Sequence, residues 1–244
     1  MPELAQKCIA SWKTFFPGYE IKEWNESNYD VHKIPYISEA YDAKKFAFVS
    51  DYTRFDVLYQ YGGIYFDTDV EVIRAFDDVL AKGAFMGLES IGNVAAGLGM
   101  GCNAGLGIIA EILEFYNNLH ENTKTVVGYV TDILRKHGFK DENKIQTIAG
   151  IVIYPIEYFC PKEYGTGVCT ISPVTHSIHH YAASWVPYHI DKYRILGQKI
   201  IAKHGDNFVT KFIYYSLQLV IRIKQYGIKY TFEYYHKRLC KKST

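Results

Sequence analysis

The chain has 244 residues, of which 48% are hydrophobic, and its 27 basic residues nearly balance its 26 acidic ones to give a net charge of +1. The hydrophobic content excludes a disordered chain, and the balanced charge excludes a general electrostatic attraction to nucleic acid. A chain of this length can bury one large core, so we expect one main domain over residues 1–205 and a separate segment over residues 206–244.

Five cysteines, an odd number, occur without any CxxC spacing. This pattern is typical of free thiols in a reducing compartment rather than of a disulfide framework. The sequence opens without the charged and apolar regions of a secretion signal, and no apolar run approaches the ~18 residues that a membrane-spanning helix needs. We therefore expect a cytoplasmic protein.

The first 38 residues predict a helix, a short strand and a turn-rich stretch. Apolar residues recur at intervals of three and four over residues 3–16, which predicts a helix that Pro17 and Gly18 end. Residues 19–24 alternate in the manner of a strand, and residues 25–38 are rich in turn-forming and polar residues.

A stronger helix is predicted over residues 43–61. Gly62 and Gly63 end it, because a residue without a Cβ readily adopts the left-handed conformation of a helix cap. The short apolar run at residues 64–66 then predicts a buried strand.

Helices and strands continue to alternate further along the chain. Residues 85–88 and 151–154 are apolar runs typical of buried strands, and residues 108–120 and 126–137 have helical periodicity. This alternation predicts an α/β fold in which helices flank a mixed central sheet.

The C-terminal segment, residues 206–244, has a different composition from the rest of the chain. Eight Lys and Arg residues accompany only two acidic ones, and apolar and aromatic residues are interspersed among them. Such a basic amphipathic helix can lie on an anionic membrane surface. It can equally pack on the main domain with its basic face in water, and the composition does not separate these two interpretations.

Two carboxylates, Asp67 and Asp69, directly follow the predicted strand at residues 64–66. In α/β folds, ligands bind beyond the carboxyl ends of the strands. Carboxylate oxygens in small number are typical ligands of Mg²⁺ or Mn²⁺, which keep coordination positions open for phosphate oxygens. The pair therefore predicts a site for a divalent ion and a nucleotide diphosphate.

Asp51 and Arg54 lie on one face of the predicted helix that precedes this strand, because residues three apart are neighbours on a helix surface. Their position just before the Asp pair indicates a role in the same site. A plain surface ion pair of about 0.3 kcal/mol is the alternative interpretation.

The combined pattern, SDxxR followed by YxxGGxYxDxD over residues 47–69, resembles the DXD sugar-binding region of the family 32 glycosyltransferases. That family includes capsular polysaccharide enzymes and an initiating mannosyltransferase, and the catalytic core of the large glucosylating toxins is similar. The resemblance implies a GT-A-type nucleotide-sugar-binding fold, so residues 1–205 would form the catalytic domain.

The resemblance also implies the roles of individual residues. Asp69 would be a direct metal ligand, and Asp67 would contact the metal–nucleotide complex or the ribose. Asp51 and Arg54 would bind the hydroxyl groups of the donor sugar, and Tyr65 would lie beside the nucleotide.

Three further assignments come from the downstream chain. The family places a metal ligand near residues 178–185, followed by a Ser-Trp pair that closes over the diphosphate; here Ser184 and Trp185 form that pair and His180 fits the ligand best, with His179 as its competitor. Asn103 matches a loop residue that the family often presents to the donor sugar.

The implied function is a metal-dependent, retaining hexosyltransferase that uses Mn²⁺ or Mg²⁺ and a UDP- or GDP-linked sugar. Its acceptor would be a glycan or a lipid-linked oligosaccharide in surface polysaccharide biosynthesis, with the enzyme peripheral at the inner face of the membrane. Relatives generally begin with a strand such as IPKIIH, which this sequence lacks.

Two other function classes remain as alternatives. The absence of the first strand favours a non-catalytic protein that binds nucleotide sugars or glycans. A phosphatase also uses an Asp-x-Asp motif after an apolar strand, but its fifth position is normally Thr or Val and here it is Glu71.

Overall fold

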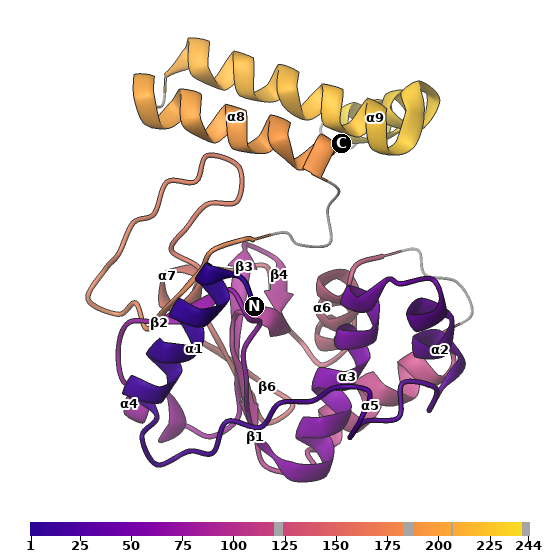
Figure 1. Ribbon diagram of the computed structural model, residues 1–244, viewed down its shortest axis with the longest axis vertical. Helices are drawn as coiled ribbons and strands as arrows, with labels where there is room; N and C mark the ends of the chain where they lie inside the picture. The colour runs from indigo at the N-terminus through magenta and orange to yellow at the C-terminus, as the bar shows by residue number, and fades with distance from the viewer. Residues whose placement is uncertain (120–123, 183–187, 206, 241–244) are drawn as a thin grey trace. The chain divides into compact units, whose positions relative to one another are not determined.

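The computed structural model describes residues 1–119, 124–182, 188–205 and 207–240. The chain divides into two compact units (Figure 1). The first unit comprises residues 1–162 and 170–181, and the second comprises residues 163–169 and 182–244. The second unit thus begins earlier in the chain than residue 206, where the composition changes.

The first unit is a mixed α/β structure, which confirms the predicted fold class. Its elements in chain order are α1 (Glu3–Phe15), α2 (Pro35–Asp42), α3 (Phe46–Tyr61), β1 (Gly63–Tyr65), β2 (Val70–Val72), α4 (Asp77–Leu80), β3 (Phe85–Ser90), β4 (Asn93–Ala95), the 3-10 helix η1 (Ala96–Leu98), β5 (Met100–Cys102), α5 (Gly107–Asn117), α6 (Val126–Lys136), β6 (Gln146–Ile148), β7 (Ile151–Tyr154), α7 (Ile156–Phe159) and β8 (Ser177–His179).

The central sheet has the strand order β1-β5-β3-β7-β6, with β4 paired to β3. Only β3 and β7 run parallel to each other, and the remaining pairs are antiparallel. A separate two-stranded antiparallel sheet joins β2 to β8. Because β1 belongs to one sheet and β2 to the other, the short turn between them connects the two sheets.

Alternating side chains of the central strands fill two cores, one on each face of the sheet. Phe85 and Val152 lie in one core, whereas their chain neighbours Met86 and Ile153 lie in the other, as the two-residue period of a strand requires. Helices α1 and α4 lie on the first side of the sheet, and α3, α5 and α6 lie on the second (Figure 1). The sheet is therefore covered on both faces.

Helix α1 holds β2 by two hydrogen bonds. The indole Nε1 of Trp12 donates to the carbonyl oxygen of Val70 at 2.8 Å, and the amide of Val72 donates to Oγ of Ser11 at 2.9 Å. These bonds satisfy backbone groups of a three-residue strand and hold it in place.

Most of the predicted helices and strands are confirmed, with two corrections in the first 45 residues. Residues 19–24 form no strand; their alternation buries no apolar face, since Tyr19 and Ile21 are 52% and 42% exposed. Helix α2 was not predicted. It is short, begins with a proline at its first position, and depends on packing Ile37 and Ala40 into the core beside α3.

The second unit contains α8 (Tyr188–His204) and α9 (Phe208–Cys240), which pack against each other. They approach closely where Gly197 meets the ring of Tyr214, because a Cβ on Gly197 would lie 2.9 Å from that ring. Gly227 adopts φ 82° and divides α9 into two helical parts. Among the helices that the structure describes, none is both long and apolar enough to cross a membrane.

A pair of Gly→Ala substitutions tests the packing of the sheet. Gly87→Ala is expected to destabilise the protein by about 1–3 kcal/mol, because the new Cβ would lie 2.5 Å from the fully buried ring of Phe159. Gly107→Ala, at the first residue of α5 and with nothing within 4 Å, is expected to be neutral or slightly stabilising. Urea denaturation measures both, and equal unfolding free energies for the two variants would contradict this packing.

Candidate functional site

The Asp67–Asp69 motif lies on the turn between β1 and β2. The amide of Asp67 donates to the carbonyl oxygen of Gly97 at 3.0 Å, and the amide of Val70 donates back to the carbonyl oxygen of Asp67 at 3.0 Å. These two bonds fix the backbone on both sides of the Asp67 side chain, which is 30% exposed.

Gly97 packs directly against the Asp67 carboxylate. A Cβ at position 97 would lie 2.0 Å from Oδ2 of Asp67 and 3.2 Å from Nη1 of Arg54. Only glycine permits this approach, so the 3-10 helix that follows β4 shapes one wall of the site.

Arg54 connects two of the three aspartates of the sequence motif, Asp51 and Asp67. Its Nη2 donates to Oδ1 of Asp51 at 3.0 Å, and its Nη1 lies 3.3 Å from Oδ1 of Asp67. The hydroxyl of Tyr65 donates to the same Asp67 oxygen at 2.7 Å, and the Arg54 guanidinium lies 4.9 Å from the centre of the Tyr65 ring. Asp51, Arg54, Tyr65 and Asp67 therefore form one connected network.

The Asp51–Arg54 pair is buried, which excludes the surface ion pair considered for these two residues. The exposed fractions of the two residues are 8% and 4%. Burial raises the pKa of Asp51 to about 6, although the Arg54 charge acts to lower it. For Arg54, burial alone would lower the pKa, but Asp67, Tyr65 and Asp51 together raise it above its ordinary value, so the guanidinium stays charged.

His179 completes a cluster with the two aspartates. Potential ligand atoms of Asp67, Asp69 and His179 all lie within 4.8 Å of one another, and Nε2 of His179 is 3.2 Å from Oδ1 of Asp69. Within the part of the chain that the structure describes, Nδ1 of His179 is buried without a hydrogen-bond partner. A buried polar atom of this kind is unusual in a folded protein and is typical of functional sites.

His180, which the sequence favoured as the metal ligand, directly follows β8, and its side chain contacts Glu71 instead of the two aspartates. Val70 pairs with His179, so the next residue stands opposite Asp69, and the amide of His180 donates to the Asp69 carbonyl oxygen at 2.9 Å. Its ring is 2.8 Å from Oε2 of Glu71. Because neighbouring residues of a strand point to opposite faces, only His179 reaches the carboxylate cluster.

Glu89 is a site residue that the sequence analysis missed. It lies near the end of β3, is hydrogen-bonded to the Tyr181 hydroxyl, and interacts electrostatically with His179 and Asp67. Burial raises its pKa, against the opposing effects of His179 and Tyr181. The sequence does contain a signal for Glu89: an acidic residue directly follows the apolar run at residues 85–88, and acidic residues are rare in buried strands.

The structure places Asn103 away from this cluster. Strand β5 runs antiparallel to β1 with Cys102 opposite Gly63, so Asn103 lies beside Gly62, at the end of β1 that is farther from Asp67. At about 3.3 Å per residue, that end is on the order of 13 Å from Asp67. The donor-sugar role inferred for Asn103 is therefore not supported by its position. Ser184 and Trp185 lie outside the described residues.

The chemistry of the cluster fits a divalent cation. Two carboxylates and an imidazole supply oxygen and nitrogen ligands, and Asp51 and Glu89 add negative charge nearby that Arg54 only partly offsets. The potential ligand atoms of Asp67, Asp69 and His179, all within 4.8 Å of one another, would hold such an ion. Nε2 of His179, which lies 3.2 Å from Asp69, is the ring nitrogen placed to join these carboxylates.

Comparison with known families finds one match, in the N-terminal part of the chain. Residues 2–86 match the model of the family described as a glycosyltransferase sugar-binding region containing a DXD motif. This confirms the resemblance for the stretch that runs from α1 into β3 and contains Asp51, Arg54, Asp67 and Asp69. The matched stretch is similar to that sugar-binding region, and the mixed α/β structure is consistent with the GT-A fold. No curated protein and no solved structure matched the chain.

Two histidine variants test which histidine is the metal ligand. The sequence favoured His180, whereas the structure places His179 beside the two aspartates. His179→Ala is expected to weaken Mn²⁺ binding at least tenfold, because the loss of even a secondary contact around a metal costs about 10–100-fold. His180→Ala is expected to leave binding within about threefold of the wild type, because its ring is bonded to Glu71. The electron paramagnetic resonance signal of free Mn²⁺ measures both affinities, and the reverse order would restore His180 as the ligand.

Proposed function

We propose that the protein is a metal-dependent, retaining glycosyltransferase. It would transfer a hexose or N-acetylhexosamine from a UDP- or GDP-linked donor to a glycan or lipid-linked acceptor in surface polysaccharide biosynthesis. The observation that carries the proposal is the cluster of Asp67, Asp69 and His179 beside the Arg54 network. The two aspartates and Arg54 lie within the segment that matches the sugar-binding family, and His179 comes from outside it.

Asp69 and His179 would hold the ion, with Asp67 contacting the ion or the nucleotide. An imidazole nitrogen among the ligands favours Mn²⁺ over Mg²⁺, which prefers oxygen ligands. When bound, the ion supplies positive charge that stabilises the departing diphosphate.

Arg54 would act chiefly by positioning Asp67. Its described partners, the Ser50 carbonyl and hydroxyl, Asp51 and Asp67, take four of its five N–H groups. The remaining N–H on Nη1 and the second oxygen of Asp51 are then the groups available to a donor sugar hydroxyl. Because the network is formed without substrate, little reorganisation would be needed when the donor binds.

The second unit supports the proposed contact with an anionic membrane surface. Four large apolar side chains of α9 are exposed and occur at helical spacing on one face: Phe208 (84%), Phe212 (66%), Tyr215 (65%) and Leu219 (41%). The same segment has the excess of basic residues noted in the sequence. An apolar stripe within a basic helix is typical of segments that lie in the headgroup region of an anionic leaflet.

Vesicle binding tests this role of α9. The full chain is expected to co-sediment with vesicles of phosphatidylcholine and phosphatidylserine more strongly than with phosphatidylcholine alone. The double variant Phe208→Ser/Phe212→Ser is expected to bind at least tenfold more weakly, because each exposed ring contributes about 1.5 kcal/mol or more when buried. Ile91→Ser, which removes a 60% exposed side chain from the first unit, is the control. Unchanged binding of the double variant would exclude α9 as the membrane contact.

A donor screen tests the enzymatic function. Purified protein with Mn²⁺ and a panel of UDP- and GDP-sugars is expected to release nucleotide diphosphate from one donor, and a chelator should stop the release. Asp69→Asn is expected to lower this turnover at least about 100-fold through loss of charge stabilisation, whereas Asp42→Asn, on the exposed end of α2, should not. Donor binding without turnover would favour the non-catalytic binding protein, and near-normal turnover by Asp69→Asn would remove that residue from the site.

A further inference from the structure

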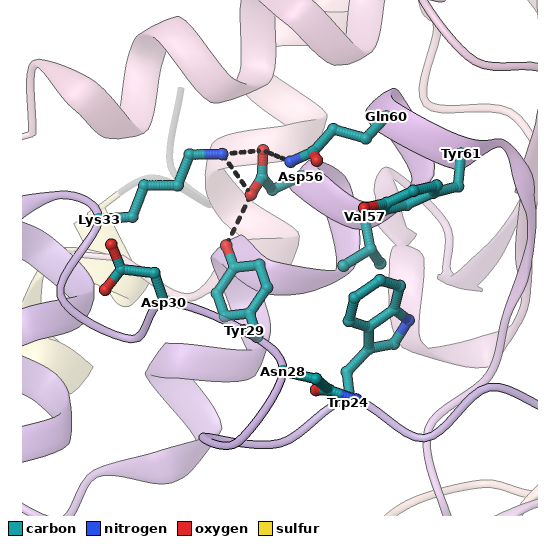
Figure 2. Close-up of a pocket in the computed structure, with 9 residues that line it drawn as sticks. All are labelled: Trp24, Asn28, Tyr29, Asp30, Lys33, Asp56, Val57, Gln60 and Tyr61. Atoms are coloured by element: carbon teal, nitrogen blue, oxygen red, sulfur yellow. Dashed lines mark hydrogen bonds and ion pairs between the residues drawn. The ribbon is translucent and has the colours of Figure 1, made fainter.

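A second cavity, of about 290 Å³, lies between α3 and the irregular segment that precedes α2 (Figure 2). Small-molecule pockets commonly measure about 300–1,000 Å³. This cavity is therefore near the lower limit, a size that suits a short sugar segment rather than a whole nucleotide sugar.

One wall of the cavity is aromatic. The rings of Trp24 and Tyr61 lie 5.2 Å apart between centroids and are tilted by 31°. The ammonium of Lys22 lies over both rings, at 4.7 and 4.8 Å, and does not itself line the cavity. Tyr61 is 61% exposed, which leaves much of its ring surface open to a ligand.

The facing wall is polar and already organised. Asp56 is buried and accepts hydrogen bonds from the Tyr29 hydroxyl at 2.8 Å, from Lys33 at 2.7 and 2.8 Å, and from Gln60 Nε2 at 2.9 Å (Figure 2). These bonds hold together the polar side chains of two chain segments, the one that precedes α2 and α3 itself. Such convergent polar groups opposite an apolar surface are the usual composition of a specific small-molecule site.

The charges of the lining favour a neutral ligand. Asp56 is paired with Lys33, and Asp30 is the one further charged residue among those that line the cavity. The Lys22 ammonium over the aromatic wall offsets Asp30, so the charges around the cavity balance and give no net attraction for phosphate or a nucleotide diphosphate. A neutral pyranose ring, with apolar C–H faces and hydroxyl edges, matches both walls.

The cavity is separate from the metal cluster, although both use α3. An α-helix turns by 100° per residue, so Asp56 and Gln60 lie 140–180° around α3 from Asp51. The cavity and the Asp51–Arg54 network are therefore on opposite sides of the helix. The helix with its side chains is about 10 Å across. A glycan could thus bind here without displacing a donor.

We propose that this cavity is a non-catalytic subsite for a neutral sugar segment of the acceptor glycan. Binding of a neutral sugar follows from the cavity itself, whereas its identity as acceptor rests on the proposed transferase function. A subsite of this kind would hold a growing chain near the enzyme between transfers by raising its effective concentration.

Saturation-transfer NMR with four neutral disaccharides, namely N,N′-diacetylchitobiose, lactose, maltose and mannobiose, tests the proposal on the full chain in the presence of a chelator. At least one disaccharide is expected to bind. Tyr61→Ala is expected to weaken that binding about fivefold or more, the value of one aromatic contact. Phe46→Ala removes another exposed aromatic residue, at the opposite end of the same helix, and is expected to have no effect.

The outcomes separate this proposal from the proposed function. Disaccharide binding that depends on Tyr61 supports the subsite even if no donor is turned over. No saturation transfer to any of the four disaccharides, or equal affinity in the Tyr61→Ala and Phe46→Ala variants, would overturn it. Displacement of the disaccharide by UDP-glucose without metal would also overturn it, because the cavity would then be a donor site.

Discussion

The buried guanidinium of Arg54 is the interaction on which the site depends. It lies between Asp51 on its own helix and Asp67 on the turn after β1, and thereby joins α3 to the edge of the sheet. A buried charge is costly unless it is paired, so each of these three residues needs the other two. The close approach of Gly97 and the hydroxyl of Tyr65 fit around this arrangement. The Asp67 carboxylate is consequently held in place by contacts within the protein.

The small β2–β8 sheet adds a histidine to the two aspartates that follow the central-sheet strand β1. It brings His179, more than 100 residues away in sequence, to the turn that carries the two aspartates. Its register also sends His180 to the opposite face, where it contacts Glu71, which in turn is bonded to Lys7 of α1. The N-terminal helix therefore supports the metal cluster indirectly through β2, in addition to its hydrogen bonds from Trp12 and Ser11.

Helix α3 serves two sites because its two polar faces have different partners. Asp51 and Arg54 face the DXD turn, whereas Asp56 faces the loop before α2 and pairs with Lys33. Buried acids on both sides of one helix are rare unless each is satisfied by specific partners, and both are. The proposed donor site and the proposed glycan subsite are thus built on one rigid element, which keeps their separation constant.

The sequence by itself determined the α/β class, the helices at residues 3–16, 43–61 and 126–137, and the metal motif, because periodicity and local spacing encode them. The tertiary structure alone placed His179, and not His180, beside the two aspartates, because strand register is a non-local property and a shift of one residue reverses the faces. It likewise placed Asn103 at the far end of β1 and brought Glu89 to the site. Neither position follows from local pattern, since each depends on which strands pair.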